Sequence, residues 1–169
     1  EIITCDWSSD VCSSDLVQAV SRIQIESWWS AFADILTEQT LEEHLKEDAI
    51  EQMYRHVLAD ERFHGLLLTL DGQPHAMAFW SAARGEQTPG LAELICIHSL
   101  KGNWGKGYGS QLMERALAEM KAAGYREVLL WVFEQNLRAR RFYEKFGFSL
   151  SGQQQNNLGA NEIQYRKAL

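Results

Sequence analysis

Several features that would place this chain in a specialised class are missing from its sequence. No uninterrupted apolar run approaches the roughly 20 residues of a membrane-spanning helix, and no Lys/Arg tract marks a nucleic-acid surface. The net charge of −7 also disfavours nucleic acid. We therefore expect neither a membrane nor a nucleic acid as a partner. The chain has 169 residues, 46% of them hydrophobic, which is enough for one globular domain with a real core.

Cysteine is scarce as well. Cys5 and Cys12 lie near the start of the chain, and Cys96 lies within an apolar segment. A lone cysteine in such a segment is most often core filler. The sequence therefore predicts no disulfide framework and a cytoplasmic location. It predicts no metal site.

The first 16 residues look foreign to the rest of the chain. From Asp6 to Leu16 the sequence matches, residue for residue, the translation of a DNA sequencing adapter. The segment is not a signal peptide, because it has neither a basic start nor an apolar centre. We therefore interpret residues 1–16 as non-native and adapter-derived, and we assign residues 17–169 to a single domain.

Hydrophobic periodicity divides residues 17–169 into helices and strands. Thr40 and Glu43 form a capping box at the second helix, and Asp71-Gly72 marks a hairpin turn. Antiparallel strands followed by a strand–helix–strand crossover predict a mixed α/β sheet with helices on both faces. The expected helices are 17–36, 40–59 with a break, 107–123 and 137–146; the expected strands are 65–70, 76–83, 91–100, 127–133, 148–153 and 162–167, the last two around a polar loop at 154–161.

A glycine-rich loop, residues 104–110, stands between the strand 91–100 and the helix after it. Such a loop holds several backbone N–H groups free at a positive helix end, which suits a pyrophosphate. A Walker loop is excluded because Tyr108 stands where lysine is required, and a dinucleotide fingerprint is excluded because Leu112 replaces its third glycine. The loop therefore predicts a phosphate-bearing cofactor of another kind.

This loop resembles the acetyl-CoA loop of the GNAT superfamily of N-acetyltransferases, whose pattern is Arg/Gln-x-x-Gly-x-Gly/Ala. Trp104, Gly107 and Gly109 take the three defined positions, and Trp104 departs from the usual Arg/Gln. The segment from Asn136 to Phe148 resembles the family's Asn-x-x-Ala-x-x-Phe/Leu-Tyr-x-x-x-Gly-Phe signature. The resemblance implies the GNAT acyl-CoA N-acyltransferase fold, an α/β fold whose first strand would here be missing or replaced.

The resemblance implies direct transfer of the acetyl group of acetyl-CoA to a primary amine of a small-molecule or amino-acid-like acceptor. Two alternatives stay open, a protein or peptide amine acetyltransferase and a CoA-binding module without turnover. Many relatives dimerise, so a homodimer stays open too.

Two residues carry the chemistry in this interpretation. Tyr143 would protonate the leaving thiolate, because a hydrogen-bonded phenol can donate its proton as the C–S bond breaks. An amine with a pKa of about 10.4 must lose a proton before it attacks, and Glu93 would take that proton. His98 and Glu134 are reserve bases.

The remaining site residues would bind the two substrates. Trp28, Trp29 and Phe32 would form a wall of the acceptor pocket, which suits an apolar or cationic acceptor because aromatic faces attract cations. Arg141, with Arg138, could approach the 3′-phosphate of CoA. The full set expected to bind acetyl-CoA is Ile97, His98, Ser99, Trp104, Gly105, Lys106, Gly107, Tyr108, Gly109, Ser110, Asn136 and Arg141.

Overall fold

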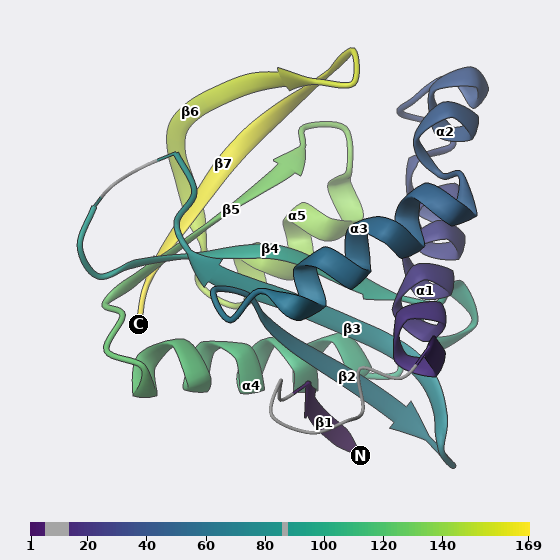
Figure 1. The fold of residues 1–169 in the computed structure, drawn as a ribbon. Coiled ribbons are helices and arrows are strands. Elements are labelled where there is room, and N and C mark those ends of the chain that lie inside the picture. The colour runs from purple at the N-terminus through teal and green to yellow at the C-terminus, as the bar shows by residue number, and fades with distance from the viewer. Residues whose placement is uncertain (6–13, 86–87) are drawn as a thin grey trace.

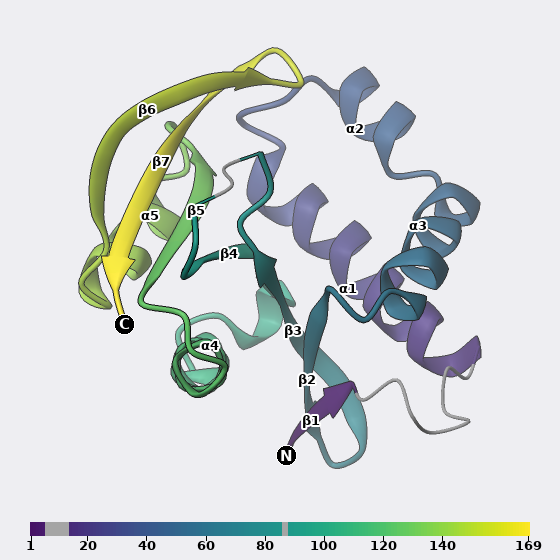
Figure 2. The same ribbon diagram turned by 60° about the vertical axis from the view of Figure 1, so that its left-hand side comes forward.

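A computed structural model describes residues 1–5, 14–85 and 88–169. The described residues form one sheet in the order β1-β2-β3-β4-β5-β7-β6, with helices on both faces (Figures 1 and 2). β4 and β5 are parallel, and every other neighbouring pair is antiparallel. The elements are β1 (Ile2–Cys5), α1 (Ser14–Phe32), α2 (Glu38–His44), α3 (Glu47–Ala59), β2 (His64–Leu70), β3 (Gln73–Ala82), β4 (Leu91–Ser99), η1 (Lys101–Asn103), α4 (Tyr108–Ala122), β5 (Glu127–Phe133), α5 (Leu137–Lys145), β6 (Ser149–Asn157) and β7 (Ala160–Ala168).

The sheet separates two hydrophobic cores. Because side chains alternate across a strand, Leu66 and Leu68 of β2 face the core that includes α4 and α5, whereas Leu67 faces the core that includes α1 and α3. Met77 and Phe79 of β3 join Leu67 in the second core. Strands buried on both faces are apolar throughout, which is why the central strands were clear in the sequence.

The two parallel strands diverge, and this divergence creates the space for a site. β4 and β5 pair only at Leu91–Glu127, Ala92–Val128 and Glu93–Leu129. Just beyond, the β3–β4 register shifts between Phe79 and Trp80, so that Ile95 is an additional residue on β4. Such a bulge bends a strand. The β5-facing side of β4 therefore has no paired strand over 94–99.

Several predicted boundaries differ from the structure, and two of them have a clear local cause. The N-cap of α2 is Thr37 rather than Thr40, because the Thr37 side chain accepts the Thr40 backbone N–H and the helix then begins one turn earlier. The expected polar loop 154–161 is part of a hairpin that turns at Leu158-Gly159. β6 is an exposed edge strand, so its backbone pairing with β7 needs no apolar pattern.

The start of the chain supplies a first strand, so this strand is not missing, and its being a replacement for a native strand stays a prediction. β1 pairs antiparallel with β2, from Ile2–Leu68 to Cys5–Gly65. Residues 6–13 of the adapter-like segment lie outside the described residues, and α1 begins at Ser14. The adapter-derived origin of this segment stays a prediction. Across the described ranges, no helix combines the length and the apolar character needed to cross a membrane.

Candidate active site

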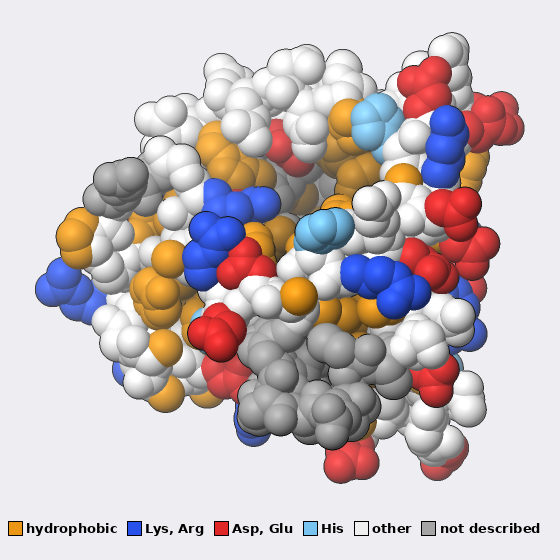
Figure 3. All heavy atoms as spheres, viewed as in Figure 1, with side chains coloured by type: hydrophobic (Ala, Val, Ile, Leu, Met, Phe, Trp, Pro, Cys, Tyr) orange, Lys and Arg blue, Asp and Glu red, His pale blue; other side chains and the backbone are white. Residues whose placement is uncertain are grey.

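Two cavities, of about 440 and 420 Å³, adjoin where β4 and β5 diverge. We call the first the helix cavity, since Trp28, Phe32 and Tyr54 of α1 and α3 line it. The second is the loop cavity, lined by the glycine loop. The surface is hollowed between the β6–β7 hairpin and the helices, and hydrophobic side chains line the hollow (Figure 3). The residues that line both cavities are Ile97, His98, Ser99, Trp104, Arg138, Ala139 and Tyr143.

The glycine loop presents unused backbone donors to the loop cavity. Gly105 and Gly107 have φ of 78° and 86°, in the left-handed region that favours glycine. Gly107 is the N-cap of α4, and the N–H groups of its first turn, 108–110, have no partner within the helix. The Trp104 indole donates to the Ser99 carbonyl at 2.8 Å and ties the loop to the end of β4. This arrangement has the backbone geometry of an anion-binding nest at a positive helix end.

The cations at the loop cavity differ in part from those expected. Arg138 and Lys145 line it, and the Arg138 guanidinium lies 3.5 Å from the centre of the Trp104 ring. Arg141 is exposed and lines neither cavity, because its position on α5 turns it away from the glycine loop. Lys106 also lies outside the lining, and its ammonium donates to Asn103.

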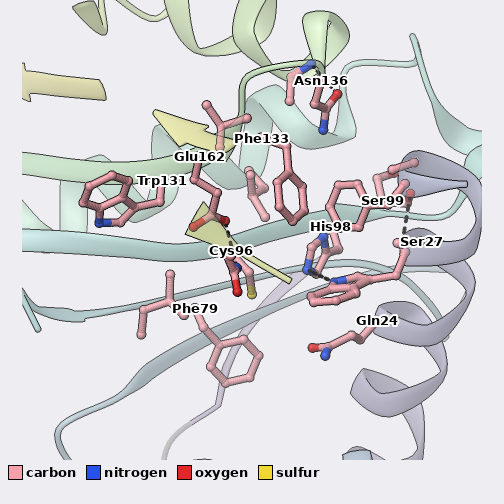
Figure 4. A pocket seen from close by; sticks show the side chains of 18 of the residues that line it. Gln24, Ser27, Phe79, Cys96, His98, Ser99, Trp131, Phe133, Asn136 and Glu162 are labelled. Carbon is pink, nitrogen blue, oxygen red and sulfur yellow. Dashed lines mark hydrogen bonds between the residues drawn. The ribbon is translucent and has the colours of Figure 1, made fainter. Parts of the chain in front are cut away.

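Polar atoms without protein partners gather at the junction of the cavities. The Ser99 hydroxyl is buried and has no hydrogen-bond partner among the described residues. Burial raises the pKa of Tyr143 well above its ordinary value, so its hydroxyl keeps its proton. Asn136 caps α5 by accepting the Ala139 N–H at 3.2 Å, and its amide nitrogen turns toward the cavity (Figure 4). The Ser99 and Tyr143 hydroxyls and the Asn136 amide nitrogen thus have hydrogen-bonding capacity that the described residues do not use.

Aromatic side chains form the wall of the helix cavity, and of the three predicted acceptor residues the structure places Trp28 and Phe32 there. Phe32 packs edge-on against Trp28 and Phe133, with ring centres 5.1 Å apart in each pair. The Trp28 indole donates to Nε2 of His98 at 3.4 Å, and burial lowers the pKa of His98 to about 4, so its ring is uncharged at neutral pH. Trp29 is 37% exposed and lines neither cavity, because the next helical position points about 100° away.

The structure does not bring Glu93 to the cavities. Its carboxylate is 4% exposed and accepts three hydrogen bonds from Arg84, from the backbone N–H, Nε and Nη2. Glu93 is still paired with Leu129, before the strands diverge, and it lines neither cavity. Glu134 is exposed and accepts from Asn161.

Sequence reasoning missed Glu162, which lines the helix cavity. It lies on β7, directly after the segment 154–161 that was predicted to be a polar loop. A glutamate at such a place gives no indication in the sequence that its side chain is buried. In the described ranges, no group of three or more His, Cys, Asp and Glu side chains is arranged to hold a metal.

Sequence comparison decides the family. The family described as Acetyltransferase (GNAT) family matches residues 29–148, which is most of the chain. The chain belongs to the GNAT acetyltransferase family. Uncharacterised N-acetyltransferases of Mycobacterium tuberculosis and Mycobacterium bovis are 39% identical to it over 69 residues, 41% of this chain and 44% of the relatives. The match thus spans less than half the length of these curated relatives.

Solved structures show the same GNAT fold. The PaiA N-acetyltransferase of Thermoplasma acidophilum, solved in complex with coenzyme A, is 19% identical, covers 99% of both chains and has a TM-score of 0.78. The ribosomal-protein-S18-alanine N-acetyltransferase of Escherichia coli is 18% identical over 99% of this chain and 94% of that one, with a TM-score of 0.69. At these identities the likeness shows the fold alone.

Proposed function

We propose that this GNAT protein transfers the acetyl group of acetyl-CoA to a primary amine of a small-molecule or amino-acid-like acceptor. One observation carries the proposal: a cavity with unused backbone donors adjoins an aromatic cavity, and Tyr143 lines both. The first cavity suits a phosphate-bearing donor and the second an organic acceptor. The tyrosine stands where the reacting groups of the two would meet.

The residues present fit the CoA part of the donor. The nest at 107–110 suits the pyrophosphate, helped by the dipole of α4. The unpaired side of β4 and the Asn136 amide suit the amide groups of the pantetheine arm, which could align as an added strand. Arg138 and Lys145 are the cations available for the 3′-phosphate. The buried, unpartnered Ser99 hydroxyl gives a further hydrogen-bonding group along this path.

Acetyl-CoA supplies an activated thioester, and the chain supplies placement and a proton. Backbone N–H groups on the free side of β4 can polarise a carbonyl held against it. Tyr143 retains its proton over the whole working pH range and donates it toward the departing sulfur. Because Glu93 lines neither cavity, we assign removal of the amine proton to water at the open cavity.

A small acceptor fits better than a folded protein. The helix cavity of about 440 Å³ lies in the size range of small-molecule sites, and aromatic side chains line it. A protein amine is the alternative, since two similar structures are ribosomal-protein alanine acetyltransferases, of Escherichia coli and of Brucella melitensis. A terminal amine on a flexible peptide would need only its last residues in the cavity.

Calorimetric titration tests the donor site. Acetyl-CoA should bind saturably to the purified protein, and dephospho-CoA should bind more weakly because it lacks the 3′-phosphate that Arg138 and Lys145 attract. Release of CoA thiol on adding amines from a panel would then establish turnover. A folded protein that does not bind acetyl-CoA would contradict the proposal, and one that binds it without turnover on any amine or peptide would favour a binding module.

Replacing Glu93 by glutamine should affect stability rather than catalysis. The change removes the charge from hydrogen bonds with Arg84 at a nearly buried position, so the free energy of unfolding should fall by about 1–3 kcal/mol. Urea unfolding and kcat, measured on the same preparation, check this. Glu127→Gln is the control, because its ion pair with Arg166 is partly exposed. A large fall in kcat without loss of stability would restore Glu93 as the base.

A further inference from the structure

Glu162 places a buried carboxylate in the wall of the helix cavity. Its exposed fraction is 9%, and it lies opposite Phe133 in the β5–β7 register. Figure 4 shows its side chain between Trp131 and Phe133, close to Cys96. Glu162 lines the helix cavity alone, whereas Tyr143 lines both cavities.

Only neutral groups hold this carboxylate. Gln155 Nε2 donates to one oxygen at 2.9 Å, and Asn157 Nδ2 donates to the other at 3.1 Å. Neither amide carries a charge, and no ion pair joins Glu162 to a cation in the described part of the chain. A buried carboxylate is usually paired with a cation, because amides compensate only part of the lost hydration. The missing counter-charge is therefore expected from a ligand.

The arginines of the helix cavity are engaged elsewhere. Arg84 is held by the buried carboxylate of Glu93, at 2.7 Å between Nη2 and Oε1. Arg138 lies over the ring of Trp104, at the end shared with the loop cavity. Neither guanidinium forms an ion pair with Glu162, so within the described residues its carboxyl group has only amide partners.

The other groups near Glu162 favour a cation over a neutral ligand. Burial raises the pKa of Cys96 to about 12, so its thiol is uncharged. The rings of Trp131 and Phe133 stand on either side of the carboxylate (Figure 4). Aromatic faces attract cations, and a carboxylate between two rings is a familiar way to bind an ammonium group.

We propose that Glu162 binds a second, non-reacting ammonium of the acceptor and thereby selects acceptors that carry two positive charges. Because Tyr143 lines both cavities and Glu162 lines only the helix cavity, we assign to Glu162 a nitrogen other than the one that is acetylated. It is a specificity-determining residue, and its contact fixes the distance between the two nitrogens. The inference rests on the proposed function.

A pair of probes of equal length tests the selection. 1,5-Diaminopentane carries a second ammonium where 5-amino-1-pentanol carries a hydroxyl. With the unaltered protein, kcat/KM should be at least about tenfold higher for the diamine, the range of one charge-assisted hydrogen bond. Glu162→Gln should remove this preference by raising KM for the diamine with kcat retained, and Glu162→Asp should restore part of it. Glu127→Gln, a change at a glutamate outside both cavities, should keep the full preference.

A binding measurement separates this inference from the proposed function. Calorimetric titration of the diamine into the CoA-saturated protein should give a weaker affinity for Glu162→Gln than for the unaltered protein, whether or not turnover occurs. Equal kcat/KM for the two probes on the unaltered protein would overturn the proposal. So would a fall in kcat of equal size for both probes in Glu162→Gln, which would make Glu162 the general base. Absence of acetyl-CoA binding, by contrast, counts against the proposed function.

Discussion

Replacing Tyr143 by phenylalanine should lower kcat by about 100-fold or more, the range of a positioned general acid, while the affinity for acetyl-CoA stays nearly unchanged. The substitution removes one oxygen from a side chain that is 8% exposed and keeps its aromatic ring in the core with Phe142 and Phe148. No hydrogen bond joins the hydroxyl to the described residues, so its loss leaves no protein group unpaired. Stability should therefore change little.

The raised pKa of Tyr143 fixes the pH dependence of this effect. Burial is the main cause, and it disfavours the phenolate, so the hydroxyl stays protonated above its ordinary pKa of 10. The rate should rise with pH as the acceptor amine loses its proton and should not fall again below about pH 10. A descending limb near neutral pH would mean that a different group supplies the proton.

Tyr165→Phe is the matched control. Tyr165 is also buried and its ring centre lies 6.5 Å from that of Tyr143, but it lines neither cavity. Its hydroxyl donates to Glu144 and accepts from Arg140, so this change should cost about 1 kcal/mol of stability. Its kcat should remain that of the unaltered protein. If Tyr143→Phe had the same kcat as Tyr165→Phe, Tyr143 would not be the acid.

The sequence predicted the parts of the fold that have a local cause. The strand 127–133 was predicted to the residue, because a strand buried on both faces is apolar throughout. Asp71 and Gly72 both have positive φ, as the hairpin turn between β2 and β3 requires. The glycines at 105 and 107 likewise need the left-handed region, so the loop could be recognised from their spacing.

The parts that were missed depend on contacts between distant segments. Glu93 and Glu162 are both glutamates on strands, and only the pairing of the sheet decides which one reaches a cavity. Glu93 forms an ion pair with Arg84, which lies nine residues earlier in the chain, and hydrophobic periodicity cannot reveal such a pair. Glu162 reaches the helix cavity because β7 pairs with β5. The register of this pairing depends on the β6–β7 hairpin, and the exposed strand β6 has no apolar pattern from which it could be predicted.

Replacing Gly107 by valine should weaken acetyl-CoA binding by about 100-fold or more, a loss of about 2.7 kcal/mol. The φ of 86° at this N-cap is strained for a β-branched residue, and relaxation would turn the N–H groups of 108–110 away from the pyrophosphate. A Cβ at Gly107 would meet no protein atom within 4 Å. The effect would therefore come from the strained backbone and from the valine side chain, which would occupy space in front of the loop. Calorimetric titration with acetyl-CoA measures it.

Gly124→Val separates loss of the nest from loss of stability. Gly124 follows the other end of α4, has a φ of 91°, and a Cβ there would also meet nothing within 4 Å. The two variants should therefore lose similar stability, about 1–3 kcal/mol for the strained backbone, but only Gly107→Val should lose affinity for acetyl-CoA. Equal affinities in the two variants would show that the glycine loop does not hold the pyrophosphate. Unequal affinities at matched stability would assign the binding to the N-terminal turn of α4, where the free N–H groups lie.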